Sequence, residues 1–411
     1  DKVNRLYENV IWGQKSNFID IPTDCPQRDE RLGWTGDAQV FIKTAAYNFD
    51  VKKFFKKWLH DLAAAQKDDG AVPQVIPSVL PNNTSLPCAA WGDAAVICPW
   101  QIYVTYGDKS VLEEQLNSME SWINYILSHT TEEYLWCGAN QLGDWLALDA
   151  VGGSSEENMR GASNEDLVAS AYFAYSVSII IKARGVLGLS TVYYQNLYDN
   201  ILAAFRKKFK EYKTQTECVL ALAFDLATSK KETAEKLVRL IKDNDNKLST
   251  GFVGTTYLLS ALSDNGYTEL AYSLLLEEDY PSWLFSVNMG ATTIWEHWDG
   301  MKKDGSMWSD KMNSFNHYAY GSVAAWMYET ILGIKADESK PGFENVILHP
   351  RPDRRLKWAE GSFETKYGTI KSRWQYEDGY IRYEFTVPNE AVIITGNNSY
   401  KVSKGTYVFC E

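Results

Sequence analysis

The sequence predicts a mainly α-helical fold, an (α/α)6 barrel, followed by a small C-terminal antiparallel β-sandwich domain. Through roughly the first 335 residues, apolar side chains recur at three- and four-residue spacing, as at Leu167, Ala171 and Ala174. That spacing is the period of an amphipathic helix. From Gly342 onward, prolines and short alternating runs replace this pattern, which is typical of strands between turns. A chain of 411 residues also suits two domains.

The expected helices alternate along the first four fifths of the chain. The clearest periodic segments are 37–66, 110–129, 164–189, 191–209, 231–242 and 313–334. Weaker ones are 91–106, 216–226, 254–262, 268–277 and 282–298. Together they indicate about a dozen helices, and six helical hairpins would need this number.

The expected strands are short. They cover 345–349, 362–367, 369–375, 380–387, 391–395 and 406–410. In these runs valine, isoleucine, tyrosine and threonine alternate with polar residues, and turns containing glycine and asparagine separate them. We therefore assign residues 1–335 to the barrel and residues 336–411 to the β-sandwich.

The bulk composition excludes several classes of protein. A net charge of −12 would repel phosphate backbones, so we expect no nucleic-acid partner. No run approaches the roughly 18 consecutive apolar residues of a membrane helix, so we expect a soluble protein without a membrane partner. The six cysteines are scattered, without a C-x-x-C pair, and predict no metal site. Aromatic residues make up 14% of the chain, and such rings stack on sugars as well as fill cores.

One loop, residues 17–37, carries an unusual density of charge. Its prolines and glycines forbid a continuous helix, while acidic and basic residues follow one another between Asp24 and Asp37. An ordinary solvated loop with surface ion pairs is one interpretation. Apolar anchors such as Leu32 and Trp34 interleave with the charges, however, and anchored carboxylates beside arginines are typical of a binding site.

A second segment, residues 288–298, places Glu296 between Trp295 and His297. It has two interpretations: a helix end with its carboxylate in water, or a carboxylate held among rings in a site. His317, beside Phe315 and Tyr318, is either a hydroxyl ligand or a satisfied core histidine. Glycoside hydrolysis in its usual form needs two carboxyl groups, one of which donates a proton to the leaving oxygen. Glu30 and Glu296 are the candidates for this pair.

Several motifs in order carry a family resemblance. Residues 21–39 read IPTDCPQRDERLGWTGDAQ, and LGDW at 142–145, IWEHW at 294–298 and NHY at 316–318 follow. The stretch 341–374 adds PGFENVILHPRP and WAEGSFETKYGTIKSRW. The whole resembles the bacterial α-L-rhamnosidases, glycoside hydrolase family 78. Members of that family usually carry β-sandwich domains ahead of the barrel, whereas here the helical pattern begins close to residue 1.

The resemblance implies hydrolysis of terminal α-L-rhamnosyl groups with inversion, on a rhamnose-containing glycoside or polysaccharide, without an organic cofactor or a metal. It assigns Glu30 as general acid and Glu296 as general base. By the same resemblance, the substrate-binding residues are Asp24, Arg28, Trp34, Asp37, Trp91, Asp144, Trp145 and His317. Among them, Trp34 would pack on the sugar, and Trp91 and Trp145 would form aromatic walls.

Two alternatives stay open at this point. One is an inverting glycosidase with the same barrel and another sugar specificity, since this fold supports many chemistries. The other is a carbohydrate-binding homologue that has lost catalysis, which the presence of both carboxylates disfavours.

Two structural expectations follow from the same residues. We expect Arg28 to be held by at least one carboxylate, and the glycine- and serine-rich loop 151–163 to border the site.

Overall fold

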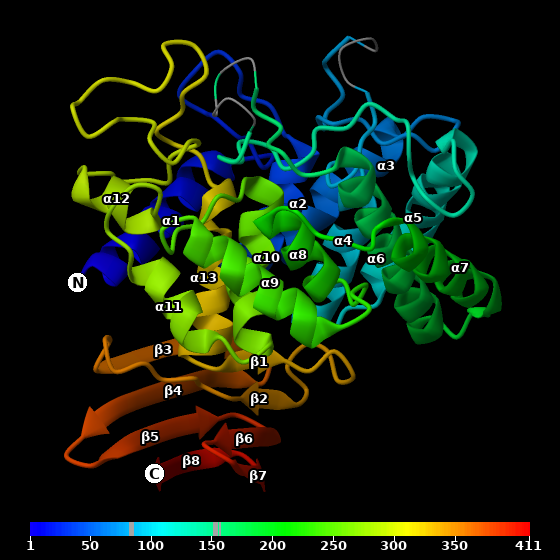
Figure 1. The fold of residues 1–411 in the computed structure, drawn as a ribbon. Helices are drawn as coiled ribbons and strands as arrows, with labels where there is room; N and C mark the ends of the chain where they lie inside the picture. The colour runs from blue at the N-terminus through cyan, green and yellow to red at the C-terminus, as the bar shows by residue number, and fades with distance from the viewer. Residues whose placement is uncertain (82–85, 151–154, 156–157) are drawn as a thin grey trace.

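The structure is a computed structural model that describes residues 1–81, 86–150, 155 and 158–411. Its two parts are a helical barrel and, against one end of that barrel, a β-domain that contains the C-terminus (Figure 1). The predicted fold class, an (α/α)6 barrel followed by a β-sandwich, is confirmed.

Six inner helices form a closed ring. They are α2 (Thr35–Asn48), α4 (Ala94–Tyr106), α6 (Glu165–Val186), α8 (Gln215–Ala223), α10 (Phe252–Asp264) and α13 (Val323–Trp326). Each contacts the next in this order, and α13 closes the ring by contacting α2. The inner helices are buried on nearly all sides, because helices that are apolar all round are stable only inside a protein.

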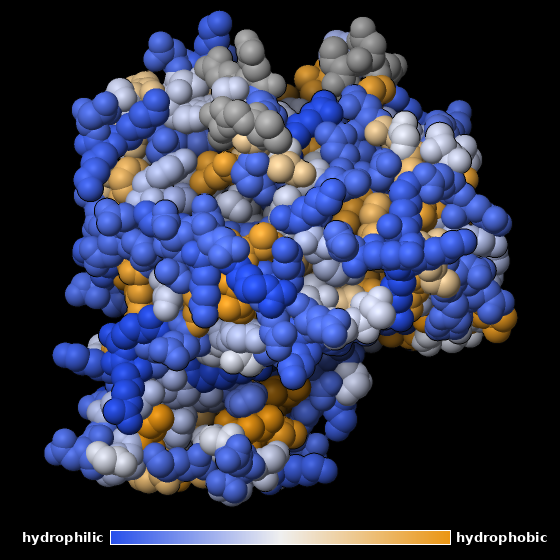
Figure 2. All heavy atoms as spheres, viewed as in Figure 1, coloured by the Kyte–Doolittle hydropathy of each residue, from blue (hydrophilic) through white to orange (hydrophobic). Residues whose placement is uncertain are grey.

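Six outer helices surround the ring. They are α1 (Lys2–Asn17), α3 (Lys52–Ala65), α5 (Ser110–His129), α7 (Val192–Lys208), α9 (Lys230–Asp243) and α11 (Thr268–Leu276). Each buries one stripe only, as α9 does with Ala234, Leu237 and Ile241, at the spacing of an amphipathic helix. On the face of the molecule that Figure 2 shows, their outward surface is largely hydrophilic. Strict alternation of outer and inner helices is interrupted only by the short α12 (Trp283–Asn288) among the described residues.

Several predicted helix bounds were wrong. The segment 37–66 is two helices, because the chain becomes extended at Phe49, where φ is −146° and ψ is 160°. The segment 313–334 is irregular until η1 (Ala319–Ser322) begins, and it ends as a π-helical turn, η2 (Met327–Ile331). The segment 282–298 is helical only over α12.

One helix in the described part of the chain, α6, has the length and hydropathy of a membrane span, but 72% of the relevant window is buried inside the protein. Its apolar surface is covered by α4, α5, α7 and α8. The apolar character of α6 is therefore accounted for by its place in the ring.

The β-domain consists of two four-stranded sheets. One has the order β1-β2-β6-β7 and the other β3-β4-β5-β8. The strands are β1 (Ile334–Ala336), β2 (Val346–Leu348), β3 (Trp358–Thr365), β4 (Gly368–Glu377), β5 (Tyr380–Val387), β6 (Ala391–Thr395), β7 (Asn398–Val402) and β8 (Gly405–Cys410). All pairs are antiparallel except β2 with β6, which run parallel. The short strands β1 and β7 were not expected from the sequence.

The β-domain and the barrel share one continuous hydrophobic core. The indole of Trp374 on β4 donates a hydrogen bond of 2.7 Å to the carbonyl of Ile331 at the end of the barrel. The phenol of Tyr47 on α2 donates to the carbonyl of Ile334 at 3.0 Å, and its ring packs edge-on against Phe363 of β3. The β-domain thus covers the end of the barrel where the inner helices finish.

The long connections that lead from outer to inner helices gather at the opposite end (Figure 1). They include residues 18–34 before α2 and residues 289–318 before η1 and α13. The N-termini of the inner helices therefore face the end that is free of the β-domain, and both candidate carboxylates lie in these connections.

The junction between barrel and β-domain offers a test of backbone fit. Gly333 has a φ of 71°, and a Cβ there would lie 2.0 Å from the Pro350 nitrogen. We expect Gly333→Ala to lower the free energy of unfolding by about 3 kcal/mol or more, because a steric clash adds to left-handed strain. Gly266 has a φ of 89° and open space around it, so Gly266→Ala should cost only about 1–2 kcal/mol. The free energies of unfolding are measured by denaturant titration, and an equal loss in the two variants would contradict the clash at Gly333.

Candidate active site

Backbone pairing holds the charged loop before α2 in place. Gly33 accepts a hydrogen bond from the Ile76 N–H at 2.9 Å, and the Thr35 N–H donates to Gln74 at 2.8 Å. A Cβ on Gly33 would lie 2.2 Å from the Ile76 carbonyl oxygen, so glycine permits this close approach. At the other end of the turn, Asp24 accepts from the Leu32 N–H through its side chain at 3.0 Å. These anchors fix both ends of the loop, within which Arg28 and Glu30 are partly buried and Asp29 is fully exposed.

The segment that carries Glu296 is pinned as two extended chains rather than as a helix end. The His317 N–H donates to the Ile294 carbonyl at 2.7 Å, and the Glu296 N–H donates to the Ser314 carbonyl at 2.8 Å. Gly290, with a φ of 87°, lies just after the end of α12. The pairing turns the Glu296 side chain inward, where 3% of the residue is exposed.

Arg28 bridges the two candidate carboxylates. Its Nε donates to Oε2 of Glu30 at 3.1 Å, and its Nη2 contacts the same oxygen. Its Nη1 lies 3.2 Å from Oε2 of Glu296. The prediction that Arg28 is held by a carboxylate is confirmed. Charge-assisted contacts on two edges of one guanidinium fix its plane, so the two glutamates lie one guanidinium group apart.

The two glutamates differ in their surroundings. The side chain of Glu30 is 24% accessible and that of Glu296 is 4% accessible. The indole Nε1 of Trp34 donates to Oε1 of Glu30 at 2.9 Å, so Arg28 and Trp34 together orient this carboxylate. Oε2 of Glu296 is buried without a hydrogen-bond partner apart from its ion pair with Arg28.

A second ion pair connects the segment before η1 to the start of α2. The Nε2 of His317 lies 3.1 Å from Oδ1 of Asp37 in the first turn of α2. The Nδ1 of His317 accepts from the Ala319 N–H at 3.1 Å, so Nε2 carries the proton that is donated to Asp37. Ligand atoms of Asp24, Cys25 and His317 lie within 4.8 Å of one another. The structure therefore brings Asp24, Asp37 and His317 together with the two glutamates.

This concentration of buried acids alters their protonation. Burial, together with the charge of Glu30, raises the pKa of Asp24 from 3.8 to about 7. Burial also raises the pKa of Glu296 above its usual value, although His317 and Arg28 oppose the change. Desolvation disfavours the charged form of a carboxyl group, and neighbouring carboxylates add to that effect. Perturbed carboxyls in one cluster are typical of functional sites.

The structure places Asp144, which was expected to contact substrate, against backbone N–H donors. Its carboxylate is fully buried and accepts from the backbone N–H groups of Gly251, Val253 and Gly254 at 2.8, 2.9 and 3.0 Å. The hydroxyl of Thr216 donates to it as well. These bonds cap the N-terminus of α10 and leave no oxygen facing an open site. We propose a positioning role for Asp144 in place of direct binding.

The remaining aromatic candidates, Trp145 and Trp91, differ in how far their side chains are buried. Trp145 is half-buried, and its carbonyl accepts from the Phe252 N–H at 2.9 Å. Trp91 is only 3% exposed, and its ring lies against Gly36, where a Cβ would be 2.5 Å away. A ring so covered supports the start of α2 and offers little face to a sugar. Of the loop expected to border the site, residues 151–154 and 156–157 lie outside the described residues.

Sequence reasoning missed the contacts that join the two segments. The amide of Gln27 donates to the Ser314 hydroxyl at 2.6 Å, and the Met312 sulfur lies 3.6 Å from Nη2 of Arg28. The phenol of Tyr318 donates to the Pro22 carbonyl at 3.1 Å. In the sequence, only the position of Gln27 inside the charged motif indicated that one of these residues lies in the site. The partners of Gln27, Met312 and Tyr318 could not be predicted, because they depend on how the barrel closes.

The ring of six helical hairpins, with clustered acids at the end where the inner helices begin, is the architecture of a six-hairpin glycosidase domain. The sequence matches the bacterial alpha-L-rhamnosidase 6 hairpin glycosidase domain over residues 1–331 and the bacterial alpha-L-rhamnosidase C-terminal domain over residues 333–407. The chain belongs to the bacterial α-L-rhamnosidase family, which confirms the resemblance of its motifs.

Individual relatives agree. The chain is 40% identical over 394 residues to an alpha-L-rhamnosidase of Streptomyces avermitilis, which covers 94% of the chain and 37% of that relative. It is 41% identical over 399 residues to one from Alteromonas sp., which covers 94% and 43%. The chain thus spans less than half the length of these relatives.

Solved structures show the same fold. The Streptomyces avermitilis alpha-L-rhamnosidase complexed with L-rhamnose has a TM-score of 0.92 at 36% identity, over 100% of this chain and 41% of that one. The native enzyme from Aspergillus terreus has a TM-score of 0.92 at 35% identity, over 100% and 49%.

The pKa of Asp24 makes a prediction about stability. With its pKa raised from 3.8 to about 7, the folded protein holds this proton to higher pH than the unfolded chain does. Its contribution to stability is therefore complete below about pH 4 and is lost as the pH rises towards 7. Asp24→Asn keeps an acceptor for Leu32 and removes the titration, so its melting temperature should rise relative to the parent over that range. Asp29→Asn, at a fully exposed side chain, is the control, and parallel pH profiles for Asp24→Asn and the parent would contradict the shift.

Asp144 gives a second test. Asp144→Asn directs an NH2 group at backbone N–H donors in a buried position, and we expect a loss of about 3 kcal/mol in the free energy of unfolding. Asp199→Asn, on the exposed face of α7, should change stability by at most about 0.5 kcal/mol. If Asp144→Asn instead raises KM for a glycoside with stability unchanged, Asp144 contacts substrate directly.

Proposed function

We propose that this chain hydrolyses terminal α-L-rhamnosyl groups from a rhamnose-containing glycoside or polysaccharide, with inversion of the anomeric configuration. The observation that carries the proposal is the bridge of Arg28 between Glu30 and Glu296 at the loop end of a six-hairpin barrel. Membership in the bacterial α-L-rhamnosidase family supports the sugar specificity.

In this proposal Glu30 is the general acid. Its side chain is the more accessible of the two, as a group that must reach the leaving oxygen needs to be. In the structure it accepts hydrogen bonds from Arg28 and Trp34. Arrival of substrate would draw Arg28 towards sugar hydroxyls and leave Glu30 free to hold and deliver its proton.

Glu296 is then the general base. Its side chain lies deeper than that of Glu30, and burial raises its pKa, which makes a carboxylate a stronger base when it is ionised. An inverting pair needs roughly 6.5–9.5 Å between the carboxyl groups to hold the attacking water. Glutamates that lie one guanidinium group apart are compatible with that separation.

The sugar itself would be held by the remaining charged groups. Asp24, Asp37 and His317 supply acceptors and a donor for hydroxyl groups, and each is at most 4% exposed in the structure. Trp34, half-buried beside Glu30, offers a ring to the C–H face of a sugar. Charged partners on the edges and an aromatic on the face are the usual way to fix a small hydroxylated ligand.

Leaving-group dependence separates the two glutamates. Glu296→Gln removes the base, so we expect hydrolysis to fall roughly 10²–10⁴-fold for p-nitrophenyl and alkyl α-L-rhamnosides alike. Glu30→Gln should slow the alkyl glycoside far more than the p-nitrophenyl one, because p-nitrophenolate leaves without protonation. Glu8→Gln, at an exposed surface position, is the matched control. Equal losses on both substrates for Glu30→Gln would overturn its role as acid.

The stereochemical course gives an independent test. NMR of the reaction mixture before mutarotation should show β-L-rhamnose as the first product, because water attacks the face opposite the leaving group. The α-anomer appearing first would establish retention. A panel of p-nitrophenyl glycosides tests the sugar specificity. If p-nitrophenol is released faster from another glycoside than from the α-L-rhamnoside, the specificity for rhamnose is wrong, whereas the two-carboxylate mechanism is unaffected.

A further inference from the structure

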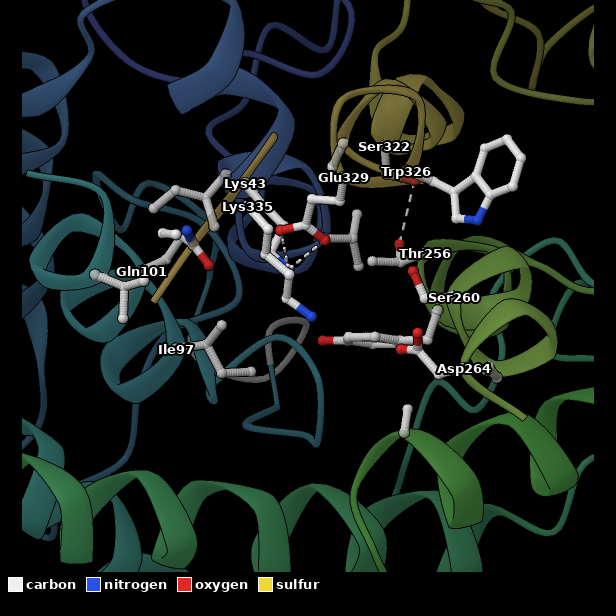
Figure 3. Close-up of a pocket in the computed structure, with 18 of the residues that line it drawn as sticks. Lys43, Ile97, Gln101, Thr256, Ser260, Asp264, Ser322, Trp326, Glu329 and Lys335 are labelled. Atoms are coloured by element: carbon white, nitrogen blue, oxygen red, sulfur yellow. Dashed lines mark hydrogen bonds and ion pairs between the residues drawn. The ribbon is translucent and has the colours of Figure 1, made fainter. Parts of the chain in front are cut away.

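A cavity lies on the barrel axis at the end remote from the candidate active site. It has a volume of about 390 Å³, and all six inner helices line it. Strand β1 adds Lys335, and Phe343 beyond β1 closes one side. Figure 3 shows Lys43, Lys335 and Glu329 on one side of this space, with Thr256 and Ser260 of α10 on another. The volume falls in the range of roughly 300–1,000 Å³ that small-molecule sites occupy.

Polar groups in the cavity face space rather than packed neighbours. Lys43 is on an inner helix, yet 43% of its side chain is accessible, and this surface faces the cavity. Gln39, one turn nearer the active site, is 3% exposed, and its Oε1 has no hydrogen-bond partner. A buried amide oxygen without a partner is costly, so a ligand that donates a hydrogen bond would be stabilised there.

The three carboxylates that line the cavity already have partners. Glu329 pairs with Lys43 at 3.0 Å, and the other two carboxylates in the lining, Glu338 and Asp264, pair with basic side chains outside it. No unpaired carboxylate is left to hold a cation. An anion is disfavoured because the inner helices end here, and their C-termini carry the negative ends of the helix dipoles. In the described part of the chain, Lys335 has no carboxylate within ion-pair distance, and its ammonium remains a free hydrogen-bond donor.

The lining suits a neutral ligand that both donates and accepts hydrogen bonds. The rings of Trp100, Tyr175 and Tyr257 supply apolar faces, and the hydroxyl of Ser260 and the amide of Gln101 supply polar contacts. We propose that this cavity binds a neutral polyhydroxylated molecule of monosaccharide size. It is a second site, separate from the candidate active site, since α2 presents Asp37 in its first turn and Lys43 in its second half.

Three sugars of one size and different charge test the proposal. D-Glucose, D-glucuronate and D-glucosamine are titrated near pH 6, where the amine is protonated, and binding to the full chain is followed by saturation-transfer NMR. We expect D-glucose to bind most tightly. Ser260→Trp fills the cavity and should weaken D-glucose binding about tenfold or more, a change of about 1.4 kcal/mol.

Lys335→Ala, on an exposed strand position, should weaken D-glucose binding several-fold. This variant tests the proposal even if Ser260→Trp does not fold. Lys401→Ala, exposed on β7 of the same sheet, should bind as the parent does. The proposal is overturned if D-glucose does not bind, if a charged analogue binds more tightly, or if the folded Ser260→Trp and Lys335→Ala variants bind D-glucose unchanged. Hydrolysis of rhamnosides is measured separately, so failure here leaves the proposed function untouched.

Discussion

The ion bridge from Glu30 through Arg28 to Glu296 is the interaction on which the rest of the candidate site depends. It joins the connection that precedes the first inner helix to the connection that precedes the last. These two segments meet only because α13 packs against α2 and closes the ring. The buried carboxylate of Glu296 would be costly without a cation beside it. Closure of the ring brings Arg28 to this position, where its charge opposes the rise in the pKa of Glu296 that burial causes.

The barrel separates two environments along its axis. At one end the inner helices begin, and the positive ends of their dipoles favour the acids that cluster there, with Asp37 in the first turn of α2. At the other end the helices finish, and the β-domain covers them through Tyr47, Trp374 and a shared hydrophobic core. The β-domain thus covers one end of the barrel, and the candidate site lies at the other.

Local pattern predicted elements well where burial follows a regular stripe. The expected bounds 110–129, 380–387 and 391–395 coincide with α5, β5 and β6, because one face of each is apolar at the period of its secondary structure. The aromatic-rich segments 282–298 and 313–334 were mistaken for helices over their full length. In these segments a backbone pairing between Ile294 and His317 overrides local propensity, and local periodicity carries no sign of it.

The sequence by itself determined which residues are candidates for the site, because the charged loop is contiguous and its apolar anchors, prolines and glycines can be identified one position at a time. It also determined the two-part architecture through the change of hydrophobic period near Gly342. The tertiary structure decided which of these groups face one another. It placed Arg28 between the glutamates and committed Asp144 to the cap of α10. Such contacts join residues far apart in the chain, and ring closure, which has no local signal, sets their geometry.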